Sequence, residues 1–119
     1  MRGRLVALLA AALVPALAGA APRASHAAAS AAAGPPARVL TVAIDGMRFQ
    51  PATLAVDPGD RVVWVNKDLV PHTVTARDGR FDSKTIAAGA SFAWTATGSG
   101  RVEYACVYHP TMVATLTLP

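Results

Sequence analysis

The chain has 119 residues, a formal net charge of +4 and 15% charged residues. This length suits one small domain, and lysines and arginines scattered singly rather than in a basic run exclude nucleic acid as an expected partner. The chain contains a single cysteine, so no disulfide can form within it and the thiol needs another explanation.

Residues 1–20 are typical of a secretory signal peptide. Met1–Arg4 carries two arginines, Leu5–Leu17 is apolar apart from Pro15, and Ala18–Ala20 supplies the small residues of a cleavage site. The apolar run is shorter than the ~20 residues that a membrane-spanning helix needs, so we expect cleavage after residue 20. The mature protein is then expected in the periplasm or otherwise outside the cytoplasm, without stable membrane association.

Residues 21–37 consist almost wholly of Ala, Pro, Ser and Gly. This composition offers too little bulky apolar surface to fold. The segment is therefore predicted to be a flexible linker, in which His26 is solvated and has no role. The folded domain is predicted to span residues 38–119.

From residue 38 onward, short alternating runs are separated by turn residues, which is the pattern of an all-β domain. A first strand is predicted over Leu40–Ile44. A second is predicted over Phe49–Val56 and ends at the turn Asp57–Asp60. The strand that begins at Arg61 carries apolar residues on both faces, so we expect it to be central in its sheet.

The second half of the domain places reactive side chains on the inner face of the strands. His72–Arg77 alternates, with His72 pointing inward and Thr73 outward. In the strand Arg101–Cys106 the inward positions put the thiol on the core side at the end of the strand. A closing strand follows, and the residues that share one of its faces are Met112, Ala114, Leu116 and Leu118.

These segments add up to seven or eight short strands, which predicts a Greek-key β-sandwich or barrel. Large aromatic residues recur within them, and sandwich cores normally hold such residues. The candidate core aromatics are Phe49, Trp64, Phe81, Phe92 and Trp94.

Four residues form a candidate metal site. Cys106, His109 and Met112 stand three apart between two predicted strands, and the inward His72 can converge with them at one end of the fold. Two imidazoles, a thiolate and a weak axial thioether are the ligand set of a type 1 copper site, whereas methionine is not a typical ligand of zinc. The sequence therefore predicts one copper ion that cycles between Cu(I) and Cu(II).

Two other interpretations of these residues stay open. A lone cysteine near a histidine also suits a nucleophilic enzyme with Cys106 as nucleophile and His109 or His72 as base. Met47 is a candidate for a second copper ligand, although we favour the interpretation that it fills space in the core or at the surface.

From about Val39 to Pro119 the chain resembles the cupredoxins, or blue copper proteins. The C-x-x-H-x-x-M loop is most similar to that of the amicyanins, and Val62–Asn66 and Pro71–Thr75 also resemble stretches of those proteins. The chain departs from the family at Thr73, where asparagine is frequent, and at Ala114, where glycine is frequent. The backbone N–H of residue 73 can still reach the cysteine sulfur.

The resemblance implies an electron shuttle rather than an enzyme. It implies copper ligation by His72, Cys106, His109 and Met112, and a monomer that docks redox protein partners through an apolar patch around the exposed histidine. Residues that can form this patch are Leu69, Val70, Pro71, Val107, Tyr108 and Pro110. The alternative function is a periplasmic copper carrier or buffer that uses the same site.

Overall fold

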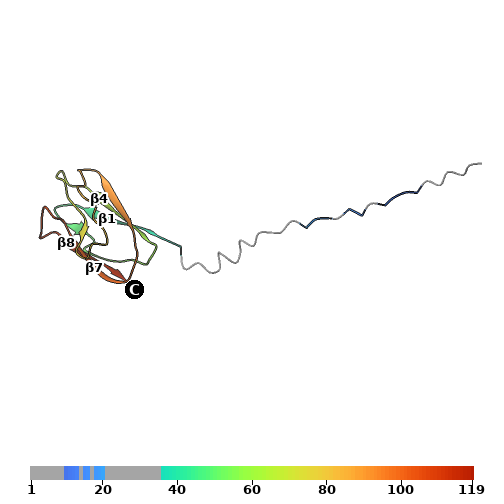
Figure 1. Cartoon of the computed structure of the whole chain (residues 1–119). Coiled ribbons are helices and arrows are strands. Elements are labelled where there is room, and N and C mark those ends of the chain that lie inside the picture. The colour runs from blue at the N-terminus through green and yellow to red at the C-terminus, as the bar shows by residue number, and fades with distance from the viewer. Residues whose placement is uncertain (1–9, 14, 17, 21–35) are drawn as a thin grey trace, which may run out of the picture. The chain divides into compact units, whose positions relative to one another are not determined.

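The computed structural model of the chain describes residues 10–13, 15–16, 18–20 and 36–119 (Figure 1). Within these residues, no helix has the length and apolar character needed to cross a bilayer. The predicted linker lies outside the described residues except for Pro36 and Ala37, as do residues 1–9 of the predicted signal peptide. Residues 36–119 belong to the second of two compact units of the chain, which spans residues 35–119.

Eight strands form two four-stranded sheets in this unit (Figure 1). The first sheet, in the order β2-β1-β4-β6, contains β1 (Val39–Ile44), β2 (Phe49–Gln50), β4 (Arg61–Asn66) and β6 (Ser91–Thr95). The second, in the order β3-β8-β7-β5, contains β3 (Thr53–Ala55), β5 (Thr75–Ala76), β7 (Gly100–Ala105) and β8 (Val113–Leu118). The predicted all-β fold of seven or eight strands is confirmed, as a sandwich rather than a closed barrel.

The register of the strands brings the ends of several strands together at one end of the sandwich. The parallel pairing of β1 with β4 sets Ile44 beside Asn66. In the second sheet, Ala105 at the end of β7 pairs with Thr75 of β5 and with Val113 of β8. We call this the site end, because Cys106 follows Ala105 directly. The central position predicted for β4 is confirmed, since it lies between β1 and β6.

The prediction of a single strand over Phe49–Val56 is wrong, because this segment forms two short strands in different sheets. β2 pairs with β1, whereas β3 pairs with β8. Pro51 lies between them and has no N–H to donate to a ladder. The carbonyl of Ala52 already accepts from the N–H of Thr115, at 2.9 Å, so the chain changes sheets at this proline.

The strand predicted over His72–Arg77 is also shorter than expected. Only β5, Thr75–Ala76, is a strand, while His72 forms an isolated bridge with Ile86. His72 is fully buried as predicted, but Thr73, expected to point outward, is only 2% exposed. Its backbone N–H and its hydroxyl both bond to the cysteine loop, which draws the residue inward.

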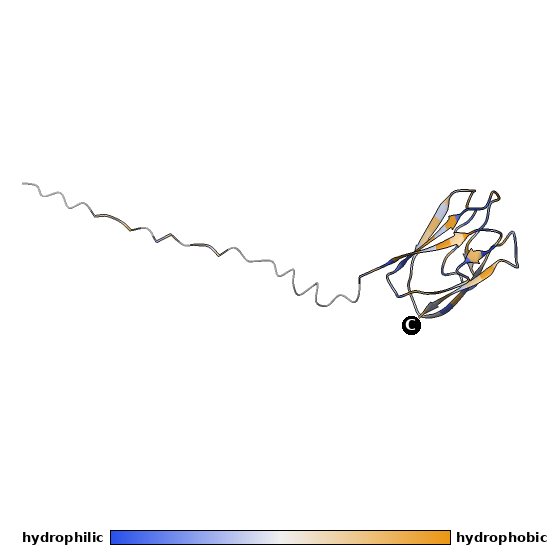
Figure 2. Ribbon diagram, turned by 180° about the vertical axis from the view of Figure 1, so that it is seen from behind, coloured by the Kyte–Doolittle hydropathy of each residue, from blue (hydrophilic) through white to orange (hydrophobic). Residues whose placement is uncertain are grey.

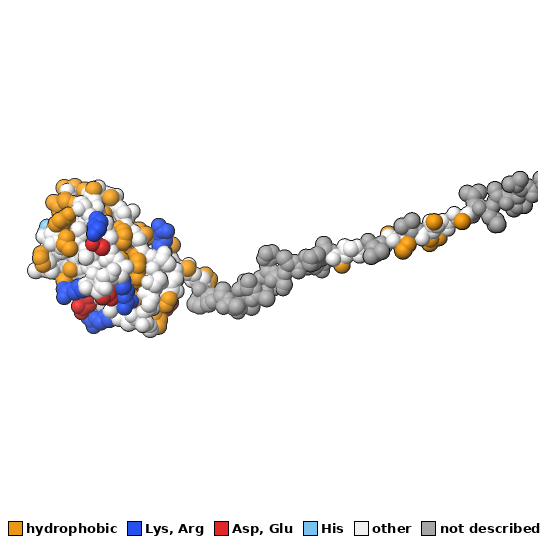
Figure 3. Space-filling view, viewed as in Figure 1, with side chains coloured by type: hydrophobic (Ala, Val, Ile, Leu, Met, Phe, Trp, Pro, Cys, Tyr) orange, Lys and Arg blue, Asp and Glu red, His pale blue; other side chains and the backbone are white. Residues whose placement is uncertain are grey.

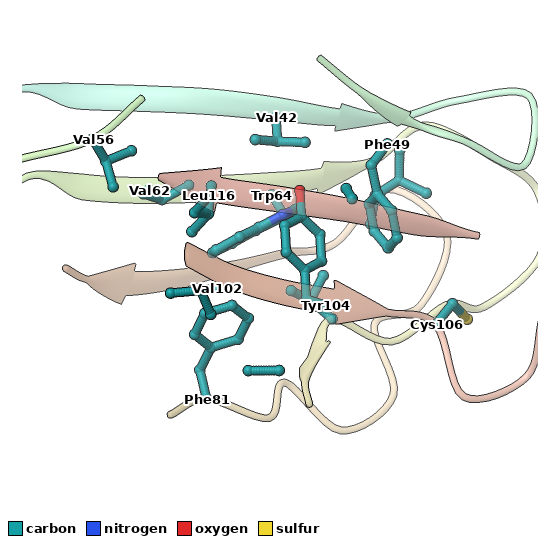
Figure 4. Close-up of a cluster of buried hydrophobic side chains, with 14 of the residues drawn as sticks. Val42, Phe49, Val56, Val62, Trp64, Phe81, Val102, Tyr104, Cys106 and Leu116 are labelled. Atoms are coloured by element: carbon teal, nitrogen blue, oxygen red, sulfur yellow. The ribbon is translucent and has the colours of Figure 1, made fainter. Parts of the chain in front are cut away.

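The core lies between the two sheets and is apolar and aromatic (Figures 2 and 4). Trp64 is fully buried, and its ring centroid lies 5.5 Å from that of Tyr104 and 5.3 Å from that of Phe81. Of the predicted core aromatics, Phe92 and Trp94 are only partly buried against this cluster. Figure 4 shows Cys106 at one end of the cluster, just beyond the end of β7, the strand that carries Tyr104.

Candidate metal centre

Three of the four predicted ligands meet at the site end. The Sγ atom of Cys106 lies 3.8 Å from Nδ1 of His72 and 3.6 Å from Nδ1 of His109. The donor atoms of the three residues all lie within 4.8 Å of one another. Cys106 and His72 are fully buried, whereas His109 is half-buried. The predicted inward direction of both Cys106 and His72 is therefore confirmed.

Met112 closes the loop that carries the other two ligands. Its N–H donates to the carbonyl of His109 at 2.8 Å, and its carbonyl accepts from the N–H of Cys106 at 3.1 Å. These two bonds make a tight turn just before β8, and the methionine side chain is only 3% exposed. All four predicted residues thus come from one end of the sandwich.

The ring of His72 is oriented by a carboxylate. Nε2 of His72 lies 2.8 Å from Oδ2 of Asp68, so Nε2 carries the hydrogen and Nδ1 keeps its lone pair facing Cys106. Metal-binding histidines are commonly fixed in this way through their second nitrogen. Sequence reasoning missed Asp68, although it precedes His72 by four residues.

Asp68 is itself held by the turn that follows β1. Its carboxylate accepts from the N–H of Gly46 at 2.7 Å and from that of Met47 at 3.0 Å. Burial opposes the charge of Asp68, but these two donors and the His72 ring together hold its pKa below the ordinary value. The side chain is therefore an acceptor at neutral pH, and it fixes the histidine as a donor.

Asn66 completes this support from the end of β4. Its Oδ1 accepts from the N–H of Asp68 at 3.0 Å, and its Nδ2 donates to the carbonyls of Val70 and Ile86 at 2.9 and 3.0 Å. The amide is fully buried, so these bonds are needed to avoid a desolvation penalty. Asn66 thereby shapes the loop between β4 and His72.

The sulfur of Cys106 accepts one backbone hydrogen bond. The N–H of Thr73 lies 3.3 Å from Sγ, which confirms the contact expected despite the departure from asparagine. The hydroxyl of Thr73 adds a contact that sequence reasoning missed, because its Oγ1 accepts from the N–H of Val107 at 2.9 Å. A short side chain thus ties the histidine segment to the cysteine loop.

The residues predicted to form an apolar rim around the half-buried His109 are exposed. Leu69 is 95% exposed and Val107 59% exposed. The other predicted rim residues are also exposed, namely Val70, Pro71, Tyr108 and Pro110. Figure 3 shows apolar side chains at the surface of the domain, and His109 is the only histidine of the described residues that is not fully buried.

The donor chemistry of this centre fits copper. A fully buried thiol has the Nδ1 atoms of two imidazoles beside it and a buried thioether residue closing its loop, and soft sulfur with imidazole favours copper among the common metals. The fold and the site together define a small metal-binding β-sandwich protein.

Comparison with known proteins identifies the family. Residues 37–119 match the copper binding proteins of the plastocyanin/azurin family, and the chain belongs to this family of cupredoxins. It is a homologue of amicyanin from Paracoccus versutus, with 30% identity over 87 residues that cover 69% of this chain and 66% of that protein. The match thus spans just under two thirds of the relative. Copper is the cofactor that this family binds.

Solved structures agree with this assignment. The Cu(I) form of a methionine-to-alanine mutant of amicyanin has 25% identity and a TM-score of 0.64, covering 76% of this chain and 89% of that one. A purple cupredoxin from Nitrosopumilus maritimus shares the fold at 24% identity and a TM-score of 0.61, covering 67% and 99%. The predicted resemblance to the cupredoxins is confirmed.

Proposed function

We propose that His72, Cys106, His109 and Met112 hold one copper ion and that the protein is a soluble shuttle of single electrons. The observation that carries this proposal is the approach of two Nδ1 atoms to one buried sulfur, at 3.8 and 3.6 Å. Bound copper would supply one-electron exchange between Cu(I) and Cu(II). Such a role involves no substrate turnover.

The contribution of the chain is a fixed set of donors. Asp68 keeps the hydrogen of His72 on Nε2, and the N–H of Thr73 directs a hydrogen bond to the sulfur. Hydrogen bonds to a metal-bound sulfur and to ligand imidazoles tune the redox potential and limit rearrangement. A nucleophilic role for Cys106 is disfavoured by its complete burial, because a nucleophile must reach its substrate.

We further propose that electrons leave through the edge of His109 to redox proteins that dock on the apolar rim. His109 is the only member of the ligand set that is not buried, and the exposed Leu69, Val107 and Tyr108 lie on the segments that flank the site. A small apolar contact suits brief encounters between redox proteins. The signal peptide predicted over residues 1–20 supports the proposal that this activity occurs in the periplasm or otherwise outside the cytoplasm.

The second candidate is a copper carrier or buffer, which needs the same pocket but releases its metal. Two fully buried ligands favour retention over release. The test is to cycle the copper-loaded protein with a chemical reductant and oxidant beside a moderate Cu(I) chelator. A shuttle regains its full visible absorbance after each cycle, whereas progressive bleaching with copper in the chelator would establish a carrier.

The exit route is tested by self-exchange between oxidised and reduced copies of the protein. Pro110→Asp places a charge on the rim and is expected to slow self-exchange while leaving colour and copper content intact. Ser99→Asp, an equal charge in the exposed turn before β7, is the matched control and should change self-exchange much less. Equal rates for both variants would place the electron exit elsewhere.

A further inference from the structure

The two residues between Cys106 and His109 are both held by hydrogen bonds to distant parts of the chain. The phenol oxygen of Tyr108 lies 2.5 Å from Oγ1 of Thr85. The N–H of Val107 donates to Oγ1 of Thr73, at 2.9 Å. Val107 and Tyr108, which set the spacing between the two ligands, are therefore each held by one hydrogen bond to another segment.

The bond to Val107 continues through a second threonine to a surface carboxylate. Oγ1 of Thr73 lies 3.1 Å from Oγ1 of Thr75, and the hydroxyl of Thr75 donates to Oδ1 of Asp82 at 3.4 Å. We call Asp82, Thr75 and Thr73 the hydroxyl relay. It runs from the surface to the backbone of the cysteine loop.

The direction of every hydrogen in this relay is fixed by its outer end. The N–H and the ammonium group of Lys84 hold the pKa of Asp82 below its ordinary value, so its carboxylate only accepts. The single hydroxyl hydrogen of Thr75 is therefore used on Asp82. Thr73 must donate to Thr75, which leaves the oxygen of Thr73 to accept from Val107. Bonds aligned in one direction polarise and strengthen one another.

The relay ends on a turn that is itself rigidly held. Lys84 has a φ of 57°, a left-handed conformation that a lysine seldom adopts without support. Asp82 supplies that support, because its Oδ1 accepts from the N–H of Lys84 and its Oδ2 from the ammonium group, both at 2.9 Å. Val74 and Ser83 bind each other through two further bonds. The turn is thus a firm anchor.

We propose that the hydroxyl relay is a brace for the copper loop, with Thr73, Thr75 and Asp82 as positioning residues that hold Val107 and so the spacing of Cys106 from His109. Its consequence for electron transfer rests on the proposed function, because a firmer loop rearranges less between the two copper states. The hydrogen bonds themselves belong to the chain and need no copper.

The test compares Thr75→Val, which removes the middle hydroxyl at nearly constant shape, with Thr75→Ser, which keeps it. Thr75→Val keeps Oγ1 of Thr73 as the acceptor for the N–H of Val107 but removes the hydroxyl that holds this oxygen in place. In the copper-free variant the Val107 amide is therefore expected to exchange with solvent about two to ten times faster than in the unaltered protein, the range that the loss of one supporting hydrogen bond gives. Thr75→Ser should restore the slow exchange. The matched control is Thr117→Val, a half-buried strand threonine with no side-chain hydrogen bond to the described residues, and it should leave Val107 unchanged.

The copper-loaded variants provide an independent readout. Thr75→Val should shift the visible absorption band and slow self-exchange severalfold, and Thr75→Ser should restore both. If Thr75→Val does not fold, Asp82→Ala removes the exposed end of the relay and is read in the same way. Unchanged Val107 exchange in a folded variant would overturn the brace. A colourless copper-loaded protein with faster Val107 exchange would instead refute the copper site and support the brace.

Discussion

At the end of the sandwich opposite Cys106, both oxygens of a buried carboxylate are bound by neighbouring groups of the chain, whereas at the site end the candidate metal-binding atoms face one another. Asp60 is 3% exposed. Its Oδ1 accepts from the N–H of Arg38 at 2.9 Å, and its Oδ2 accepts from the Arg38 guanidinium at 2.7 Å and from the N–H of Asp57 at 2.9 Å. We call this the Arg38–Asp60 latch. Both oxygens of the carboxylate are therefore engaged by donors of the chain itself.

At the site end the buried polar groups serve a different purpose, because they orient the candidate ligand atoms. His72, Asn66 and Thr73 are all buried, yet their hydrogen bonds serve to turn Nδ1 and Sγ atoms toward a common point. The comparison teaches that buried polar groups alone do not mark a site. In the latch the donors of the chain bind both carboxylate oxygens, whereas at a metal centre the hydrogen bonds orient the ligand atoms and leave their lone pairs directed at the metal position.

The largest expected effect is on the visible absorption, which a substitution at the site end should change and a substitution at the opposite end should not. Cys106→Ser should abolish the intense visible absorption of the Cu(II) protein, because charge transfer from the thiolate to copper is its source. Asp60→Asn, at the far end, should leave the absorption intact. Titration of both variants with Cu(II), followed by absorption spectroscopy, checks this. A blue Cys106→Ser protein would show that the sulfur is not a ligand.

Asp68→Asn is expected to weaken copper binding by about tenfold to a hundredfold, the usual cost of losing the group that orients a ligand histidine. The amide cannot accept all three hydrogen bonds that the carboxylate now receives. Competition with a chelator of known affinity measures the change. Unaltered affinity would mean that the tautomer of His72 is fixed without Asp68.

Much of this contrast was predictable from residue types and their alternation, and some of it was not. The inward positions of His72 and Cys106 follow from the two-residue period of a strand. Asp68 lies in a loop, where no period tells the direction of a side chain, so its role emerged only from the fold. Thr73 was placed on the wrong face because so little of His72–Arg77 pairs as a strand. Pro51 was the overlooked signal for the break between β2 and β3.

The Arg38–Asp60 latch should affect stability equally with and without copper. Asp60→Asn is expected to lower the melting temperatures of the copper-free and copper-loaded proteins by a similar amount, since copper binds at the other end. Copper itself should raise the melting temperatures of the unaltered protein and of Asp60→Asn, because a ligand bound only by the folded state adds stability. This gain is about 4 kcal/mol when the free copper concentration is a thousand times its Kd. Melting curves that lose their copper dependence in Asp60→Asn would show that the two ends are coupled.

The latch also predicts a loss of stability in acid. The Arg38 guanidinium and the N–H groups of Asp57 and Arg38 lower the pKa of Asp60 from 3.8 to about 2. A carboxyl group whose pKa is lower in the folded state stabilises the fold above its ordinary pKa, and this contribution disappears as the pH falls toward 2. Melting of the copper-free protein from pH 5 to pH 2 should show this loss, and Asp60→Asn should lack that part of it.

The smallest expected effect is a shift in potential at constant colour. Met112→Gln should keep the blue absorption but lower the redox potential, because an axial oxygen ligand favours Cu(II) more than a thioether does. Voltammetry of the two proteins measures the shift. The same potential for both would remove Met112 from the ligand set.

The central claim is that copper lies at the site end, among His72, Cys106, His109 and Met112. Anomalous diffraction at the copper absorption edge from crystals of the copper-loaded protein locates the ion directly. We predict a single strong peak within bonding distance of Nδ1 of both histidines and Sγ of the cysteine, with Met112 beside it. A peak elsewhere, such as at the exposed Met47, or none at the cysteine, would contradict the account.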